Sequence, residues 1–252
     1  MNMSKFTNVL GSTLASTASL WRGTNSRPAP NQPVQLLELY DIENCPYCRV
    51  VREALAVLDI DAIIYPCPKG GERYRTLVEE RGGKEMFPYL VDKNTGVEMY
   101  ESADIVAYLR KTYGNKSGRM NLHGLKLAGS MLSSASRGIK GQRVKLAKKS
   151  VKPLILYSFE SSPFSRPVRE LLCELELAYE LRNTGKAMMK DMGPPRLRAR
   201  LFPDEPVQGR NRLQLLEQTG KVQVPYLIDP NMSIEMFESS DIIVYLNETY
   251  AL

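Results

Sequence analysis

Long apolar runs are missing from this chain of 252 residues, and histidine is nearly absent. The apolar stretches fall well short of the roughly 20 residues that a membrane-spanning helix requires, so we expect no transmembrane helix. His123 is the single histidine, which argues against a Cys/His zinc site, and we predict no metal. The four cysteines are too few for a secreted disulfide scaffold, which is usually shorter and richer in cysteine.

Acidic residues are missing from two segments. Residues 1–33 hold three lysines and arginines, residues 111–152 hold eleven, and neither segment contains Asp or Glu. The net charge of +6 therefore combines two basic segments with mildly acidic domains. The basic segments are either solvated connectors or docking sites for an anionic surface such as nucleic acid or lipid. No aromatic residue follows Tyr113 in the second segment, so stacking on single strands lacks support and nucleic acid is not an expected partner.

The sequence contains an internal repeat. Residues 37–60 resemble residues 154–177 at an offset of 117, and residues 86–114 resemble residues 223–251 at an offset of 137. The second copy therefore carries an insertion between about residues 183 and 212, where four prolines predict an irregular loop. We place the two domains at residues 1–120 and 121–252.

The repeat extends upstream, because residues 11–23 resemble residues 129–141. Residues 1–30 alone are typical of an organelle transit peptide: rich in Ser and Thr, basic and free of acids. A cleaved signal has no reason to recur in mid-chain, however. We therefore favour a short helix before each copy and a cytoplasmic protein, with an organelle as the alternative. Apolar residues lie at helical spacing in both segments: Leu10, Leu14 and Trp21 in the first, and Leu125, Ala128, Leu132, Ala135 and Ile139 in the second.

Each copy shows the same order of elements. In the first copy the pattern predicts strands over 34–40, 61–65, 88–92 and 97–100, and helices over 46–58, 72–81 and 102–113. The order is βαβ followed by ββα, which is an α/β arrangement. One parallel crossover and a terminal hairpin predict a four-stranded mixed sheet with helices on its faces.

The tetrapeptide Cys45-Pro46-Tyr47-Cys48 falls where a strand passes into a helix. Unpaired backbone N–H groups and the helix dipole favour a thiolate there, and proline suits the first helical position. Cys48 lies about one turn after Cys45 and can form a disulfide with it, which exchange would reduce. Arg49 and Arg52 are expected to add positive charge near the thiolate.

Two further motifs follow in the first copy. Phe87-Pro88 opens a strand, where proline forfeits a ladder hydrogen bond. Either the peptide bond is cis and faces the active site, or this is an ordinary trans proline at an edge. Glu101-Ser102 precedes the last helix, where Ser102 either seats a ligand carboxylate at the helix N-terminus or serves as a cap alone.

These motifs resemble the glutaredoxin and glutathione-transferase N-terminal domain family, over roughly residues 34–114 and 153–251. The resemblance implies two tandem thioredoxin-like domains that bind glutathione. It implies that Cys45 is the nucleophile and Cys48 the resolving thiol. Glutathione would then be held by Tyr47, by the backbone of Phe87 at Pro88, by Glu101 and Ser102 at its γ-glutamyl end, and by Lys84 at its glycine carboxylate.

The second copy departs from this pattern, because it reads Ser162-Pro163-Phe164-Ser165. Serine forms no disulfide, but its hydroxyl either donates to a bound glutathione thiolate or only caps the helix. The remaining binding positions persist, so binding without redox exchange is open at Ser162, Ser165, Lys221, Val224, Pro225, Glu238 and Ser239.

The leading hypothesis is a glutathione-dependent thiol–disulfide oxidoreductase that acts on disulfide or glutathionylated proteins. The alternatives are a non-catalytic glutathione-binding or interaction module and a glutathione transferase using Ser162. The helical C-terminal domain of transferases is not visible, so we expect the two leading helices to cover the apolar faces left bare, unless the copies cover one another. Cys67 is either a third redox partner or a small turn residue, and Cys173 is expected in the core.

Overall fold

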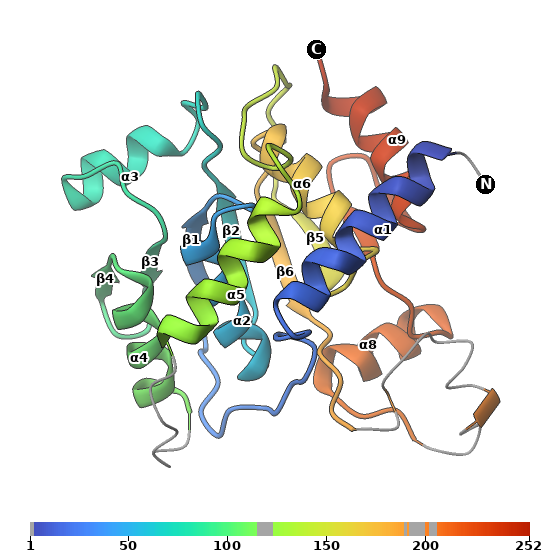
Figure 1. The fold of residues 1–252 in the computed structure, drawn as a ribbon, viewed down its shortest axis with the longest axis horizontal. Helices are drawn as coiled ribbons and strands as arrows, with labels where there is room; N and C mark the ends of the chain where they lie inside the picture. Colours follow the sequence, from blue (N-terminus) through green and yellow to red (C-terminus); the bar gives the residue numbers. More distant parts are fainter. Residues whose placement is uncertain (1–2, 115–122, 189–190, 192–199, 202–205) are drawn as a thin grey trace.

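The computed structural model describes residues 3–114, 123–188, 191, 200–201 and 206–252. The eight strands found among these residues form one sheet in the order β4-β3-β1-β2-β6-β5-β7-β8 (Figure 1). The first half contains β1 (Leu37–Asp41), β2 (Ala62–Pro66), β3 (Tyr89–Asp92) and β4 (Val97–Met99). The second half repeats it with β5 (Leu154–Ser158), β6 (Tyr179–Asn183), β7 (Tyr226–Asp229) and β8 (Ile234–Phe237). The predicted fold class, two tandem thioredoxin-like units, is confirmed.

Each half has the predicted strand directions. β1 pairs with β2 in parallel and with β3 antiparallel, and β3 pairs with β4 antiparallel. β5, β6, β7 and β8 repeat these relations. The helices that accompany the strands are α2 (Pro46–Val57), α3 (Arg75–Gly82), α4 (Ser102–Thr112), α6 (Arg166–Glu174), α8 (Arg210–Thr219) and α9 (Ser239–Tyr250).

The two halves join through their β2 and β6 edges. These strands pair antiparallel, with Ala62 opposite Leu181 and Ile64 opposite Tyr179. Because an open edge with unpaired N–H and C=O groups is a liability, this pairing protects one edge of each half. The main core of buried residues accordingly runs through both halves, from Leu39 and Leu55 to Leu156 and Leu172.

A buried carboxylate ties the hairpin to the last helix in each half. Asp92 accepts hydrogen bonds from the hydroxyls of Tyr108 at 2.6 Å and Tyr113 at 2.5 Å. Asp229 repeats this arrangement with Tyr245 at 2.7 Å and Tyr250 at 2.5 Å. The repeat therefore extends to side-chain contacts.

The two predicted leading helices are present as α1 (Met3–Ala18) and α5 (His123–Ala135). They run antiparallel and close together. A Cβ on Gly11 would lie 2.9 Å from the Arg137 guanidinium, and one on Gly129 would lie 3.3 Å from the Ala18 carbonyl oxygen. α5 packs on α2 of the first half, and α1 packs on α5 and on α6 of the second half. Each leading helix thus contacts the half that it does not precede.

The orientation of these helices differs from the expected one. Their serines face inward, and Ser12, Ser16, Ser130 and Ser133 are completely buried. Their apolar stripes face solvent, although Leu127 does pack against the main core. The expectation that the stripes cover bare apolar helix faces is therefore wrong. The helices cover α2 and α6 with hydroxyl groups, because those helices present arginines there.

Two sequence predictions fall partly or wholly outside the described residues. The boundary between residues 120 and 121 is one of them. The irregular loop predicted between about 183 and 212 is described only in part, and its last residues before 210 lead into α8.

Candidate functional site

Cys45 lies at the N-terminus of α2, as expected. It is the N-cap residue, Pro46 occupies the first helical turn, and the backbone of Cys45 is extended. The Cys45 thiol is partly exposed whereas Cys48 is buried, and both are free thiols. The Sγ atom of Cys48 accepts a hydrogen bond from the Ile42 N–H at 3.5 Å. One thiol therefore faces solvent and the other lies behind it.

The two thiols ionise differently. The hydrogen bond from the Cys48 side chain lowers the pKa of Cys45 from 9.0 to about 7. Burial opposes this shift, and the backbone N–H groups of Cys48 and Tyr47 reinforce it. Burial raises the pKa of Cys48 well above its usual range. Cys45 is thus the thiol of the pair that ionises near neutral pH, and the thiolate is the form that attacks.

Arg49 and Arg52 do not supply the positive charge expected near Cys45. Both are buried in an ion-pair network between the halves. Arg52 pairs with Glu160 of the second half at 2.9 Å, and Arg169 pairs with Glu43 of the first half at 3.0 Å. These two pairs are reciprocal, because Glu160 and Arg169 stand 117 residues after Glu43 and Arg52.

Glu160 is the most heavily paired carboxylate of this network. Burial raises its pKa, but Arg169, Arg52 and Arg49 outweigh burial and lower the pKa overall. The repeated Glu and Arg positions in the two copies were the sequence signal for this network. Because they follow Cys45 closely in the chain, the arginines were expected beside the thiolate instead.

A shallow depression of about 30 Å³ lies beside the Cys45 turn. Five of the predicted site residues line this depression: Tyr47, Phe87, Pro88, Glu101 and Ser102. Met86 lines it as well and was not predicted, although it directly precedes Phe87 in the chain. Phe87-Pro88 is a cis peptide, and the Arg75 guanidinium lies 4.8 Å from the Phe87 ring centroid.

Glu101 and Lys84 differ in their relation to this depression. Glu101 adopts a φ of 66°, which is rare for a residue with a side chain. Ser102 opens α4 beside it. Lys84 is exposed and is not among the lining residues; its carbonyl oxygen accepts the Tyr100 hydroxyl at 2.7 Å.

The corresponding residues of the second half engage one another. Ser162 and Ser165 are buried, and the Ser162 hydroxyl accepts hydrogen bonds from the N–H and the hydroxyl of Ser165 at 3.1 and 2.9 Å. That backbone contact closes the turn that leads into α6 (Arg166–Glu174), whose N-cap residue is Ser165. Glu238 has a φ of 67°, like Glu101, but accepts the Gln223 amide at 2.6 Å.

The outer part of the second site is similarly arranged. Val224-Pro225 is a cis peptide, as in the first half, and Ser239 opens α9. Lys221 places its Nζ atom 3.9 Å from the Phe237 ring centroid. The cis proline and the start of the last helix therefore repeat the first half, but the serine pair is buried.

The other two cysteines are buried. Burial raises the pKa of both Cys67 and Cys173 well above the usual range. The Sγ atom of Cys173 accepts the Glu43 N–H at 3.4 Å, and Cys67 donates to the Tyr65 carbonyl at 3.4 Å. Both therefore stay protonated near neutral pH.

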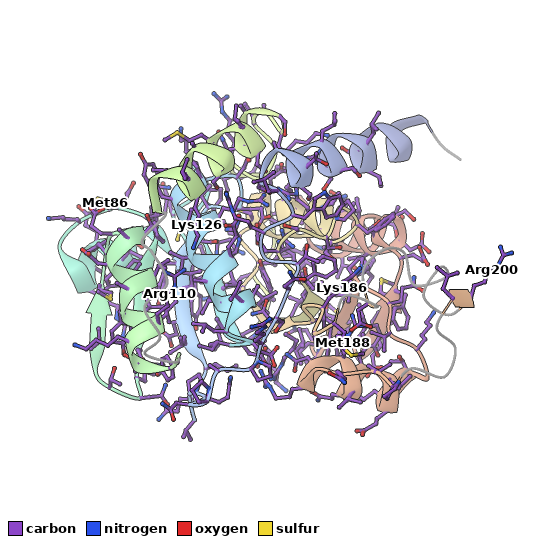
Figure 2. The ribbon with its side chains drawn as sticks, turned by 60° about the horizontal axis from the view of Figure 1, so that its bottom comes forward. Met86, Arg110, Lys126, Lys186, Met188 and Arg200 are labelled. Carbon is purple, nitrogen blue, oxygen red and sulfur yellow. The ribbon has the colours of Figure 1, made fainter. Side chains whose placement is uncertain are left out.

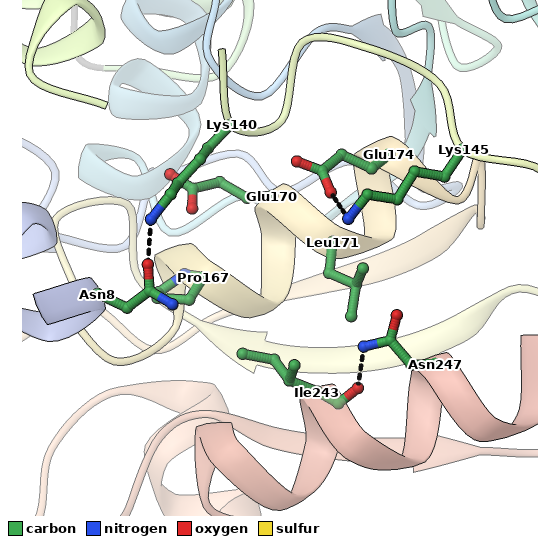
Figure 3. A pocket seen from close by; sticks show the side chains of 9 residues that line it. All are labelled: Asn8, Lys140, Lys145, Pro167, Glu170, Leu171, Glu174, Ile243 and Asn247. Carbon is green, nitrogen blue, oxygen red and sulfur yellow. Dashed lines mark hydrogen bonds and ion pairs between the residues drawn. The ribbon is translucent and has the colours of Figure 1, made fainter. Parts of the chain in front are cut away.

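A larger cavity of about 200 Å³ lies elsewhere, between α1, α6 and α9 (Figure 3). Its charged residues are engaged: Lys145 pairs with Glu174 at 2.5 Å, and Lys140 contacts the Asn8 side chain. It contains none of the predicted site residues. Among the described residues, no group of three His, Cys, Asp or Glu side chains could hold a metal ion, and no helix is long and apolar enough to cross a membrane.

A comparison with known protein families agrees with the two-fold architecture. The family described as glutathione S-transferase, N-terminal domain, matches residues 39–117 and again residues 156–252. A solved Bombyx mori glutathione transferase, BmGSTD1, is similar over 34% of this chain at 28% identity, with a TM-score of 0.31. The similar region spans 39% of that transferase. No curated protein matches the chain. Because the family match covers most of both repeats, the chain belongs to the glutathione S-transferase N-terminal domain family and carries that domain twice.

Proposed function

We propose that the first half is a glutathione-dependent thiol–disulfide oxidoreductase in which Cys45 is the nucleophile and Cys48 the resolving thiol. One observation carries the proposal: a partly exposed thiol with a pKa of about 7 stands before a buried thiol with a raised pKa. An attacking thiol is most effective when its pKa is near the ambient pH. Cys45 meets that condition, and Cys48 stays protonated until exchange requires it.

The depression next to Cys45 is the proposed glutathione site. The backbone at Phe87-Pro88 would pair with the cysteinyl part of the tripeptide. Glu101 and Ser102 at the start of α4 would hold its γ-glutamyl end, where helix N–H groups favour a carboxylate. Tyr47 would cover the ligand, and Lys84 would reach the glycine carboxylate from its exposed position.

The proposed reaction proceeds by two thiol–disulfide exchanges. The Cys45 thiolate attacks the glutathione sulfur of a mixed disulfide, which forms a Cys45–glutathione disulfide and releases the substrate as a thiolate that takes up a proton. The thiolate of a second glutathione then attacks the glutathione sulfur of that disulfide, releases oxidised glutathione and restores Cys45. With a protein disulfide, Cys48 resolves the Cys45–protein bond, and two molecules of glutathione reduce the resulting Cys45–Cys48 disulfide.

The second half is proposed to be a structural partner rather than a second catalytic site. The Ser162 hydroxyl is buried and bonded to Ser165, and Glu238 is engaged by Gln223. These contacts support a structural role for Ser162 over contact with a glutathione thiolate. Glutathione binding without turnover and conjugation through Ser162 are the competing hypotheses. We further propose a reducing compartment, the cytoplasm or an organelle, where glutathione keeps Cys45 and Cys48 reduced.

The test is a coupled assay in which glutathione and glutathione reductase reduce a small glutathione mixed disulfide. We expect turnover that Cys45→Ser abolishes and that the matched variant Ser162→Ala leaves unchanged. Retention on immobilised glutathione without turnover would instead support a binding module. Conjugation of an electrophile that is lost in Ser162→Ala would support a transferase.

A further inference from the structure

The outer layer of α1 and α5 presents an apolar surface to solvent. Figures 1 and 2 show the two helices side by side at one face of the molecule. Its large side chains are well exposed: Leu10 48%, Leu14 58%, Trp21 37%, Leu125 70%, Leu132 64% and Ile139 66%. We call these six residues the apolar face. We propose that this face docks on the surface of a membrane that contains anionic phospholipids.

The exposure of the apolar face is fixed by what lies beneath it. Arg49 donates to the hydroxyls of Ser133 at 2.8 Å and Ser19 at 2.7 Å. Arg166 donates to Ser16 at 2.9 Å. Turning either helix to bury its leucines would remove these hydroxyl partners from the two buried guanidinium groups, although Arg49 would keep its carboxylate partners Glu53 and Glu160. Buried donors that lose their acceptors are costly. The leucines therefore stay outside.

The basic residues around the apolar face indicate that its partner is an anionic lipid surface. The segments 1–33 and 123–152, which carry the apolar face, contain no Asp or Glu. Lys140 and Arg143 are exposed just after α5, and Lys140 contacts Asn8 of α1. A helix that is apolar on one side, with basic residues around it, is the pattern of a segment lying in the membrane interface. Anionic headgroups complement such charge.

Other occupants fit less well. A second copy of the chain would bring two basic rims together, and like charges across an interface oppose association. Nucleic acid is a poorer partner, because binding to it relies on contacts with phosphates and the exposed leucines offer none. The single tryptophan, Trp21, lies at the end of the apolar face, and Trp is enriched at the membrane–water interface.

Docking would bring the proposed thiol site close to the membrane. The hydroxyl of Ser130 in α5 donates to the Pro46 carbonyl oxygen at 2.9 Å. The Asn44 amide donates to the Gly138 carbonyl oxygen at 2.8 Å. The turn that carries Cys45 is thus attached directly to the underside of α5, so substrates held at the membrane surface would be presented to it.

Trp21 is a built-in reporter for the test. The full-length chain is titrated with phosphatidylcholine vesicles that contain about 30 mol% phosphatidylserine, and with pure phosphatidylcholine vesicles. We expect a blue shift of the Trp21 emission and co-sedimentation with the anionic vesicles only. Raising NaCl from about 0.1 M to about 1 M should weaken binding by about tenfold or more, because the headgroup attraction is screened.

Variants separate the apolar contribution to vesicle binding from the electrostatic contribution. Leu14→Ser with Leu132→Ser should lower the partition coefficient by about tenfold or more, because both side chains would lose their burial in lipid. Leu77→Ser with Leu213→Ser, at positions on α3 and α8 that are also exposed, is the control and should bind like the unmodified chain. Lys140→Gln with Arg143→Gln keeps the leucines and should also weaken binding to anionic vesicles.

Three results would overturn the proposal. The first is that the unmodified, folded chain binds neutral and anionic vesicles with equal affinity, or binds neither. Its circular dichroism spectrum, unchanged during the titration, would show that it had stayed folded. The second is equal loss of binding in the Leu77 and Leu213 control. The third is a dimer in analytical ultracentrifugation that the Leu14 and Leu132 variant disrupts, since that would assign the apolar face to a second copy of the chain.

Discussion

Replacing Cys48 by two different residues tests what makes Cys45 ionise near neutral pH. The hydrogen bond from the Cys48 side chain is the largest cause of the lowered pKa. Cys48→Ala removes the donor and should raise the pKa of Cys45 from about 7 toward 9.0. Cys48→Ser retains a hydroxyl donor at the same position and should keep the pKa close to its present value.

The size of the effect follows from the two pKa values. At pH 7 a thiol with a pKa of about 7 is about half ionised, and one with a pKa of 9.0 is about 1% ionised, a difference of about fiftyfold. Intrinsic nucleophilicity falls with pKa along a slope of about 0.4–0.5, which removes about six- to tenfold. Cys48→Ala should therefore be alkylated at Cys45 about five- to eightfold more slowly at pH 7.

The assay is the rate of iodoacetamide alkylation between about pH 5 and about pH 10, followed at Cys45 by peptide mass spectrometry. Cys67 and Cys173 are internal controls, because they are buried and their pKa values are raised. An unchanged midpoint in Cys48→Ala would show that the helix N-terminus, not Cys48, sets the pKa. Equal shifts in both variants would refute the role of the hydrogen bond.

Three further predictions concern the resolving thiol and the junction of the halves. Cys48→Ser should keep glutathione-linked reduction of a small mixed disulfide but lose protein-disulfide reduction, as measured by insulin reduction; loss of both activities would contradict the proposed order of exchange. Glu160→Gln should destabilise the chain by about 3–5 kcal/mol at pH 7 in urea unfolding, because it leaves Arg52 and Arg169 underpaired. The folded pKa of Glu160 is lowered, so its contribution is present above about pH 4.5 and lost as pH falls further, and the gap between the two proteins should narrow there. Deleting residues 1–24 should lower the thermal midpoint by roughly 5 °C or more, because buried arginines lose their hydroxyl partners. An unchanged midpoint would show that α1 does not contribute to the stability of the fold.

The sequence predicted the local features well because each depends on near neighbours. The offset of 117 residues and the alternation of apolar residues were enough for the order of elements in both halves. The start of α2 at Pro46 followed from the preference of proline for the first helical turn. The hairpins and the helices that begin at Ser102 and Ser239 were predicted within a residue or two for similar reasons.

Contacts between the halves were decided by the tertiary structure. The sequence shows that Leu125, Leu132 and Ile139 share one side of a helix, but periodicity does not say which side faces the protein. An apolar stripe normally turns inward. Here Arg49 and Arg166 are buried beneath the helices and require oxygen partners, so the serine side turned inward and the leucines remained outside.

Contacts between the halves also explain why Arg49 and Arg52 were wrongly expected to act on the Cys45 thiolate. Arg49 and Arg52 lie within seven residues of Cys45 in the chain, so the sequence alone favoured an effect on the thiolate. Their partner Glu160 lies more than a hundred residues away and reaches them only when β2 pairs with β6. By itself the sequence determined the elements and the position of the reactive thiol. The structure decided which charges meet, because a buried guanidinium group is stable only where the assembled fold supplies its oxygen partners.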